Sequence, residues 1–275
     1  MPPLCSNSKF VNSGTFIKKI WQHPLARGID VDHSDSLEVH RQILEAKPLL
    51  YEQHLRWYCE CLPAFEETRD LEGKILEIGS GAGFLEQVIP DVIKTDSVPN
   101  PFAEQIMNAE KLDFGGGELK NIFLISVLHH IPFPEKFFRE AERCLKRGGR
   151  LVMVEPSNNF LQRFLARYLD HYEYFDDTIG DWTNDSADRM THANLALPWV
   201  IFVRDRGRFE KEFPSLKIKE VRYHTFLSHV LTGGFSYRSL MPFWASPAVN
   251  LIETLAKPFM ERIGTMMTID IVKQE

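Results

Sequence analysis

The sequence predicts an α/β protein with a mostly parallel sheet and helices on both of its faces. Three observations predict it: short apolar runs bounded by turn residues, helical periodicity between those runs, and a glycine cluster directly after the first run, at residues 79–83. Strands that alternate with helices are joined by crossover connections and form a parallel sheet. The chain has 275 residues, of which 44% are hydrophobic, so it can bury the core that such a sheet needs.

The first part of the chain is predicted to be an arm and a helical lid, residues 1–72. A short strand is expected at 15–20, and helical signals begin at Ser36, a suitable N-cap residue. Pro48 opens the next helix at its first turn. Apolar and aromatic side chains then recur at helical spacing, at Leu50, Trp57, Tyr58 and Cys61. This stripe favours core packing, and the alternative is a lid helix over an active site.

The rest of the chain, residues 73–275, is predicted to be the core domain. Strands are expected at residues 74–78, 92–95, 105–107, 121–126, 150–154, 216–224 and 266–272. A helical turn is expected at 84–89, an amphipathic helix at 134–146 and a further helical segment at 199–213. Two insertions, at about 156–198 and 225–264, follow the fifth and sixth strands, so we expect them beside the substrate entrance.

The strongest functional signal is the stretch from Glu77 to Gly83, in which a buried strand runs into a turn of small residues. Glycine permits positive φ and a close approach of backbone N–H groups to a ligand. A helix after the turn would add partial positive charge. Asp96 ends the second strand, where an acidic residue can accept hydrogen bonds from ribose hydroxyls. Together these features predict a nucleotide-like cofactor at the carboxyl end of the strands.

The loop differs from those that bind phosphates. It lacks the Gly-Lys-Ser/Thr of a P-loop. Phe84 stands where a dinucleotide-binding loop has its third glycine, and Glu77 would repel a pyrophosphate.

Three segments together resemble a known family. Glu77-Ile-Gly-Ser-Gly-Ala-Gly83 is similar to the first motif of class I S-adenosylmethionine-dependent methyltransferases, which have a Rossmann-like seven-stranded sheet. Ser126-Val-Leu-His-His-Ile-Pro132, and the stretch from Cys144 through Gly148-Gly149 to Glu155-Pro156, resemble later motifs of the UbiE-like (methyltransferase type 11) group. The resemblance implies a small-molecule methyltransferase with S-adenosylmethionine as cofactor.

The resemblance also implies roles for individual residues. Glycines 79, 81 and 83 would pass under the methionine part of the cofactor, with Ser80 and Phe84 in the same turn. Glu77 would face the amino group and Asp96 would hold the ribose. The remaining implied contacts are Asn108 and Ala109 beside the adenine and Ser126 near the methionine end. The chain departs from the family at 97–104, where two prolines predict a loop instead of a helix, and at Gly115–Gly117.

Two histidines and one glutamate are the candidate catalytic residues. His129 and His130 follow the fourth strand, and an imidazole there could take a proton from an alcohol or an acidic carbon. The alternative is that they shape the loop and cap the next helix. Glu155 ends the fifth strand and is the third candidate; its alternative role is a hydrogen bond to the neighbouring loop.

Other classes of function are disfavoured by composition and motifs. With 32 Lys and Arg against 38 Asp and Glu, the net charge is −6, and nucleic-acid-binding domains are usually basic. No metal-ligand spacing, Cys-x-x-Cys pair or Gly-x-Ser-x-Gly elbow occurs. The four cysteines are expected to be reduced thiols of a cytoplasmic protein.

The acceptor is open at this point. A glycan or a lipid-linked sugar suits the aromatic insertions, and residues 235–260 could touch a membrane surface. Two other functions stay open, a nicotinamide-dependent oxidoreductase and a catalytically silent cofactor-binding partner subunit. The sequence makes no prediction of the oligomeric state.

Overall fold

The computed structural model describes residues 21–29, 36–168, 174–183 and 193–274. The strand expected at 15–20 lies outside these residues. Within them, none of the helices combines the length and the apolar character that crossing a bilayer would require.

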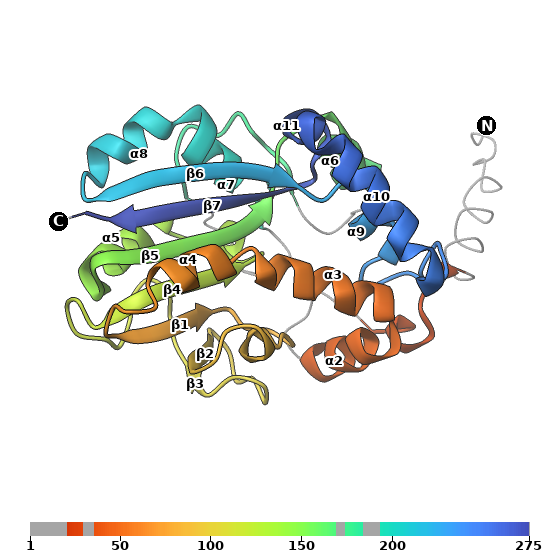
Figure 1. Ribbon diagram of the computed structural model, residues 1–275, viewed down its shortest axis with the longest axis horizontal. Coiled ribbons are helices and arrows are strands. Elements are labelled where there is room, and N and C mark those ends of the chain that lie inside the picture. Colours follow the sequence, from red (N-terminus) through yellow and green to blue (C-terminus); the bar gives the residue numbers. More distant parts are fainter. Residues whose placement is uncertain (1–20, 30–35, 169–173, 184–192, 275) are drawn as a thin grey trace, which may run out of the picture.

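A single seven-stranded sheet organises the described residues (Figure 1). Its order is β3-β2-β1-β4-β5-β7-β6, with β1 to β5 parallel and β7 antiparallel to both of its neighbours. The strands are β1 Lys74–Ile78, β2 Val92–Asp96, β3 Gln105–Ile106, β4 Leu119–Ile125, β5 Leu145–Pro156, β6 Leu216–His224 and β7 Met266–Lys273. The predicted fold class is confirmed. Strands β2 and β3 are added on one side of β1, and β4 and β5 on the other, so the strand order reverses between β1 and β4. Ligands of open parallel sheets bind at the carboxyl ends of the strands beside such a point.

One face of the sheet is covered by α5 (Pro134–Cys144), α7 (Leu197–Trp199), a π-helical turn (Val200–Arg204) and α8 (Arg206–Glu212). The inward side chains predicted for α5 are all buried: Phe137, Phe138, Ala141, Cys144 and Leu145. The helix ends two residues earlier than predicted, because β5 already begins at Leu145 and pairs there with Leu119.

The other face is covered by α3 (Pro48–Cys59) and α4 (Leu62–Glu67), and α2 (Leu37–Ala46) lies beside α3 past the strand ends (Figure 1). The predicted stripe of this layer is buried, so its packing role is confirmed. Ser36 precedes α2 as expected, but its hydroxyl bonds to the His40 ring instead of capping the backbone.

This face lacks helices between the first three strands. After the glycine loop the chain forms only a 3₁₀ turn, Leu85–Gln87. The prediction that the terminus of an α-helix adds partial positive charge beside the loop is therefore wrong. The connection from β2 to β3 is a loop, as the prolines in it predicted. Because these connections are too short for helices, α3 packs directly on the glycine-loop residues Phe84 and Leu85.

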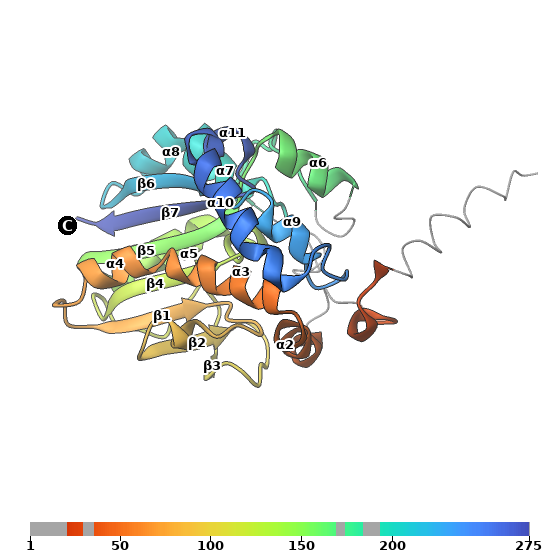
Figure 2. The ribbon, with the colours of Figure 1, turned by 45° about the vertical axis from the view of Figure 1, so that its right-hand side comes forward.

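The two insertions contain helices of their own. The first has α6 (Phe160–Tyr168), and the second has α9 (Ser228–Thr232), α10 (Ser246–Ala256) and α11 (Met260–Ile263). Helices α9 and α10 lie beside α3 at the end of the sheet where β1, β4 and β5 finish (Figures 1 and 2).

Candidate active site

The glycine loop has the backbone conformation that its sequence predicts. Gly79 and Gly81 have φ of 68° and 52°, in the left-handed region where side chains are strained. A Cβ on Gly79 would lie 2.6 Å from Cγ2 of Val127, whereas a Cβ on Gly81 would meet no atom within 4 Å. The loop is therefore packed on β4 at one end and has open space above Gly81, where a ligand can approach the backbone.

Gly83 and Phe84 face the interior. A Cβ on Gly83 would lie 2.2 Å from the hydroxyl of Tyr58. The Phe84 ring is fully buried and stacks on Tyr51, with 4.3 Å between ring centroids. Helix α3 packs on these two residues, so any contact that they make with a cofactor is through the backbone; their predicted place in the cofactor site stays a prediction.

Asp96 holds the loop from the end of β2. Its Oδ2 accepts hydrogen bonds from the Gly81 N–H at 3.1 Å and from the Asn100 amide at 2.8 Å, and its Oδ1 accepts one from the Ser97 N–H. Asn100 also donates to the Gly81 carbonyl at 2.7 Å. Oδ2 thus accepts two hydrogen bonds, whereas Oδ1 accepts one and can accept another. Asn100 was not predicted, because nothing local to the 97–104 loop indicates that it folds back onto Gly81.

Glu77 lies beneath the loop, almost without exposure, and accepts a hydrogen bond from the Ser80 hydroxyl at 2.8 Å. Burial raises the pKa of this carboxyl to about 7, and the nearby Glu86 and Asp96 carboxylates act in the same direction. Ser80 is itself buried, so it serves to orient Glu77. A cation bound over the loop would lower the pKa of Glu77, because a positive charge favours the ionised carboxylate.

The residues predicted beside an adenine lie past the short β3. Asn108 is exposed, and its side-chain oxygen accepts a hydrogen bond from the Glu110 N–H at 3.0 Å. Ala109 is buried in the core. The acceptor atom of Asn108 therefore already has a backbone partner in this turn.

The loop after β4 carries the candidate catalytic histidines. Ser126 has a positive φ of 56°, and its N–H donates to the Val154 carbonyl. The turn that follows, Leu128–His130, brings His129 next to the end of β5. The rings of His129 and His130 are in contact, with 4.2 Å between centroids and 39° between their planes.

Glu155 and His129 form a buried pair at this end of the sheet. Nδ1 of His129 lies 2.6 Å from Oε2 of Glu155, and both side chains are almost inaccessible. Oε1 accepts the N–H groups of Val127 and Leu128 at 2.9 and 2.8 Å. Glu155 thus accepts hydrogen bonds from the loop and also contacts the imidazole. Its predicted structural role, a hydrogen bond to the neighbouring loop, is therefore compatible with a catalytic role.

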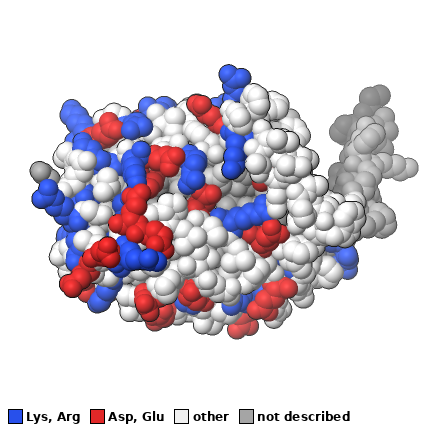
Figure 3. Space-filling view, in the orientation of Figure 1, with Lys and Arg blue, Asp and Glu red and all other residues white. Residues whose placement is uncertain are grey.

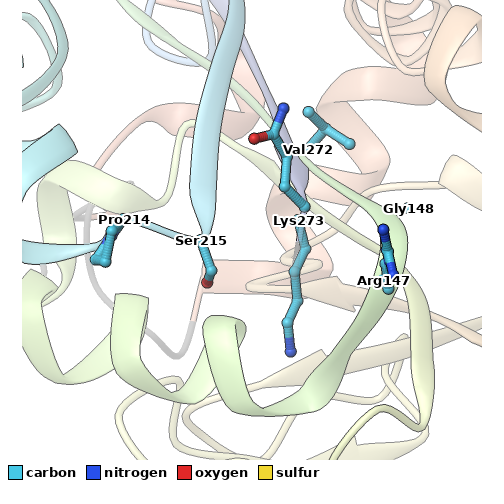
Figure 4. Close-up of a pocket in the computed structure, with 7 residues that line it drawn as sticks. Arg147, Gly148, Pro214, Ser215, Val272 and Lys273 are labelled. Atoms are coloured by element: carbon cyan, nitrogen blue, oxygen red, sulfur yellow. The ribbon is translucent and has the colours of Figure 1, made fainter.

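The described residues show no metal site, and a surface hollow among them lies away from the glycine loop. No group of three or more His, Cys, Asp or Glu among them could hold a metal ion. A surface hollow lies between the 147–148 turn and the strand ends near 215 and 273 (Figure 4). It is at the amino end of β5, opposite the glycine loop, so it is not where a cofactor of this fold binds.

Comparison with known families agrees with the fold and the loop. A family model described as a methyltransferase domain matches residues 51–195, more than half of the chain. The chain belongs to this methyltransferase family. It is a class I S-adenosylmethionine-dependent methyltransferase, as the motifs predicted.

Individual relatives are distant. The methyltransferase is 24% identical over 217 residues to a highly reducing polyketide synthase of Aspergillus niger; the match covers 62% of this chain and 8% of that protein. A Haemonchus contortus phosphoethanolamine N-methyltransferase, solved with S-adenosylmethionine, is 13% identical, with 91% of this chain and 59% of that chain covered and a TM-score of 0.46. A Thermotoga maritima methyltransferase described as a possible histamine N-methyltransferase is 16% identical, with 85% and 99% covered and a TM-score of 0.43.

The loop geometry fits S-adenosylmethionine. The space above Gly81 admits a ligand against the backbone. Asp96 stands at the neighbouring strand end, where ribose hydroxyls can donate to it. Glu77 supplies a carboxylate below the loop for an ammonium group.

Proposed function

We propose that this methyltransferase acts on a small molecule whose nucleophilic atom must lose a proton, either a hydroxyl oxygen or an acidic carbon. The observation that carries this proposal is the buried His129–Glu155 pair at the carboxyl end of the sheet. An ammonium-derived nitrogen needs no such positioned base once it is neutral, whereas an alcohol or a C–H acid does.

Glu155 gives His129 a defined tautomer. A carboxylate only accepts hydrogen bonds, so Nδ1 carries the hydrogen and the lone pair of the neutral ring is on Nε2. When bound, S-adenosylmethionine supplies a methyl group on a sulfonium, which is displaced in line by the acceptor. Nε2 of His129 would take the acceptor's proton, and Glu155 would stabilise the resulting imidazolium. The role proposed for His130 is to hold the His129 ring in place through the contact between the two tilted rings.

The distant polyketide synthase relative supports an acidic carbon or its enol as the acceptor. A carbon between two carbonyl groups loses a proton far more easily than an ordinary alkyl carbon, so one imidazole suffices as base. A hydroxyl of a glycan or of a lipid-linked sugar is the second candidate. It needs the same base and would be accommodated by the aromatic first insertion.

The test is a methyl-transfer assay with three acceptors, read by mass spectrometry: a β-ketoacyl thioester, a phenol and a primary amine. We expect methylation of one of the first two and a loss of about 100-fold or more in kcat for His129→Asn, with unchanged binding of S-adenosylhomocysteine. Turnover of the amine alone, or full activity of His129→Asn, would overturn the proposal.

We further propose that residues 1–72 act as the lid and that the protein is cytoplasmic. Peripheral membrane contact through 235–260 is supported by exposed apolar side chains there, and the surface over α10 carries few charges (Figure 3). They are Leu240, Phe243, Trp244, Leu251, Ile252, Leu255 and Phe259. Flotation with anionic and neutral liposomes tests this contact; Leu255→Glu should abolish flotation, and absence of wild-type flotation would refute it.

A further inference from the structure

A cluster of two histidines and a tryptophan lies over the carboxyl ends of β4 and β5. Trp57 of α3 packs against Val154 and Ile125, which directly precede Glu155 and Ser126. The His54 ring lies 5.0 Å from the indole, and the His229 ring of α9 meets it edge-on at 4.9 Å. The cluster thus joins the lid helix, the second insertion and the strand ends that carry the catalytic loop.

The same cluster also reaches the glycine loop. The centroid of the His54 ring lies 6.5 Å from that of Phe84, which follows Gly83, and 5.6 Å from that of Phe235. Trp57 is fixed by a hydrogen bond from its indole N–H to the Thr225 hydroxyl at 3.2 Å. The cluster therefore lies between the cofactor loop and the elements that cover the substrate side.

The two imidazoles have unused hydrogen-bonding capacity. Nδ1 of His54 lies 2.9 Å from the Leu50 carbonyl, which can only accept, so the lone pair is on Nε2. Neither this Nε2 nor the ring nitrogens of His229 has a hydrogen bond within the described part of the chain. Both side chains are only half-buried. Burial lowers the pKa of each imidazole to about 4, so both rings are neutral at pH 7.

The ring nitrogens of these half-buried side chains are accessible enough to form hydrogen bonds with water or with a ligand. Phenylalanine would fill the same volume without offering these polar atoms. The described residues offer no group that could hold a metal ion here. The two rings can therefore form hydrogen bonds with a ligand that lies against them.

The charge beside the cluster limits the kind of ligand. Lys47 is buried, and its ammonium donates to the carbonyls of Gly234 and Tyr237. Burial lowers its pKa to about 8, so it is mostly charged at pH 7, and its charge lowers the pKa of His229. A positive potential of this kind disfavours a cation.

We propose that His54, Trp57 and His229 form the wall that holds the methyl acceptor, and that this acceptor is a flat, uncharged or anionic molecule with a hydroxyl or enol donor. The identification of the ligand as the acceptor rests on the proposed function. The indole supplies an aromatic face or edge to the flat ligand. Nε2 of His54 accepts a hydrogen bond from a hydroxyl or enol group of the ligand other than the atom whose proton His129 takes. A cationic amine is excluded from this wall.

The experiment is calorimetry of the full chain with 2-naphthol and with 2-naphthylmethylammonium, without cofactor. We expect 2-naphthol to bind and the ammonium probe to bind at least about tenfold more weakly. His54→Phe removes the acceptor of the naphthol O–H, and His229→Phe removes an imidazole N–H that can donate to the naphthol oxygen. Each variant keeps the ring volume and should weaken 2-naphthol about tenfold, the value of one hydrogen bond. His54→Gln should recover part of the loss, and Tyr174→Phe, which removes an exposed hydroxyl, should have no effect.

Two readouts separate this proposal from a folding defect and from the proposed function. Each variant must keep its melting temperature and its affinity for S-adenosylhomocysteine. His129→Asn should bind 2-naphthol with the wild-type affinity. Binding of 2-naphthol therefore tests the wall alone, and methyl transfer by His129→Asn tests the base alone. Absence of 2-naphthol binding to the wild type, normal binding to both Phe variants, or tighter binding of the ammonium probe would each overturn the assignment.

Discussion

Oε2 of Glu155 lies 2.6 Å from Nδ1 of His129, and the other oxygen of the same carboxylate accepts two backbone N–H groups of the loop that carries this histidine. One side chain at the end of β5 therefore positions both the loop after β4 and the ring within it. The two residues are 26 apart in the sequence, and the parallel pairing of β4 with β5 brings them together.

Glu155→Gln tests this relationship. Glutamine keeps an oxygen that can accept the loop N–H groups, but it has no charge to stabilise an imidazolium. We expect kcat to fall about 100-fold, with little change in the KM for S-adenosylmethionine and in melting temperature. Stopped-flow or steady-state assays separate kcat from KM. A variant with unchanged kcat would show that Glu155 only shapes the loop.

The buried Glu77 predicts a pH-dependent stability. Its pKa rises from 4.5 in the unfolded chain to about 7 in the fold, mainly through burial. Between these values the folded state binds more protons, so this group's contribution to the free energy of unfolding falls as the pH rises from about 4.5 to 7. Glu77→Gln removes that loss, on the order of 3 kcal/mol at pH 8 and close to nothing at pH 4.

Urea unfolding of wild type and Glu77→Gln across this range measures the difference. The two curves should converge at low pH and separate above pH 7, with the variant more stable. Parallel curves would mean that the Glu77 carboxyl titrates normally in the fold. Ser80→Ala is the matched control, because the loss of its hydrogen bond should raise the pKa of Glu77 further and widen the pH effect.

Much of the fold could be predicted because its signals are local. Apolar runs bounded by turn residues located the strands to within a few residues, and Asp96 was identified by its place at a strand end. Gly79 and Gly81 were identified because a strand that runs directly into glycines needs positive φ. These inferences use only neighbouring residues and the geometry that all parallel sheets share.

What could not be predicted depends on packing between distant segments. Gly83 and Phe84 match the loop motif in sequence, but helix α3 packs directly on both, which no local pattern indicates. His54 and His229 are 175 positions apart, and each alone reads as an isolated histidine. Their meeting depends on α3 packing against α9, for which one sequence carries no pattern.

Asp96 and Asn100 predict a graded loss of cofactor binding. Asp96→Asn keeps the shape but removes the charge toward the Gly81 N–H and the ribose, so S-adenosylhomocysteine should bind more weakly by about tenfold or more. Asn100→Ala removes three hydrogen bonds, to the Gly81 carbonyl, to Asp96 and from the Phe102 N–H, which only stabilise the loop, so a smaller loss is expected. Calorimetry ranks the two; wild-type affinity in Asp96→Asn would contradict the proposed ribose contact.

Gly83 and Tyr58 offer a double-mutant cycle on the contact between the lid and the loop. A Cβ at position 83 would lie 2.2 Å from the Tyr58 hydroxyl and 2.8 Å from the Ser80 carbonyl, so Gly83→Ala should destabilise the fold by about 1–3 kcal/mol. Tyr58→Phe alone loses the hydrogen bond from the Phe84 N–H, about 1 kcal/mol. Because it also removes the atom that the new methyl meets first, the double variant should be less destabilised than the sum of the two single variants.

Chemical denaturation of the four proteins gives the coupling free energy. Gly207→Ala is the control for a glycine-to-alanine change: Gly207 lies in α8, and a Cβ there meets no atom within 4 Å, so this variant should be slightly stabilised. A zero coupling between positions 58 and 83 would mean that the alanine is accommodated by a shift of the loop away from α3. A double variant less destabilised than the sum of the single variants would establish that helix α3 is fitted directly to the glycine loop at Gly83.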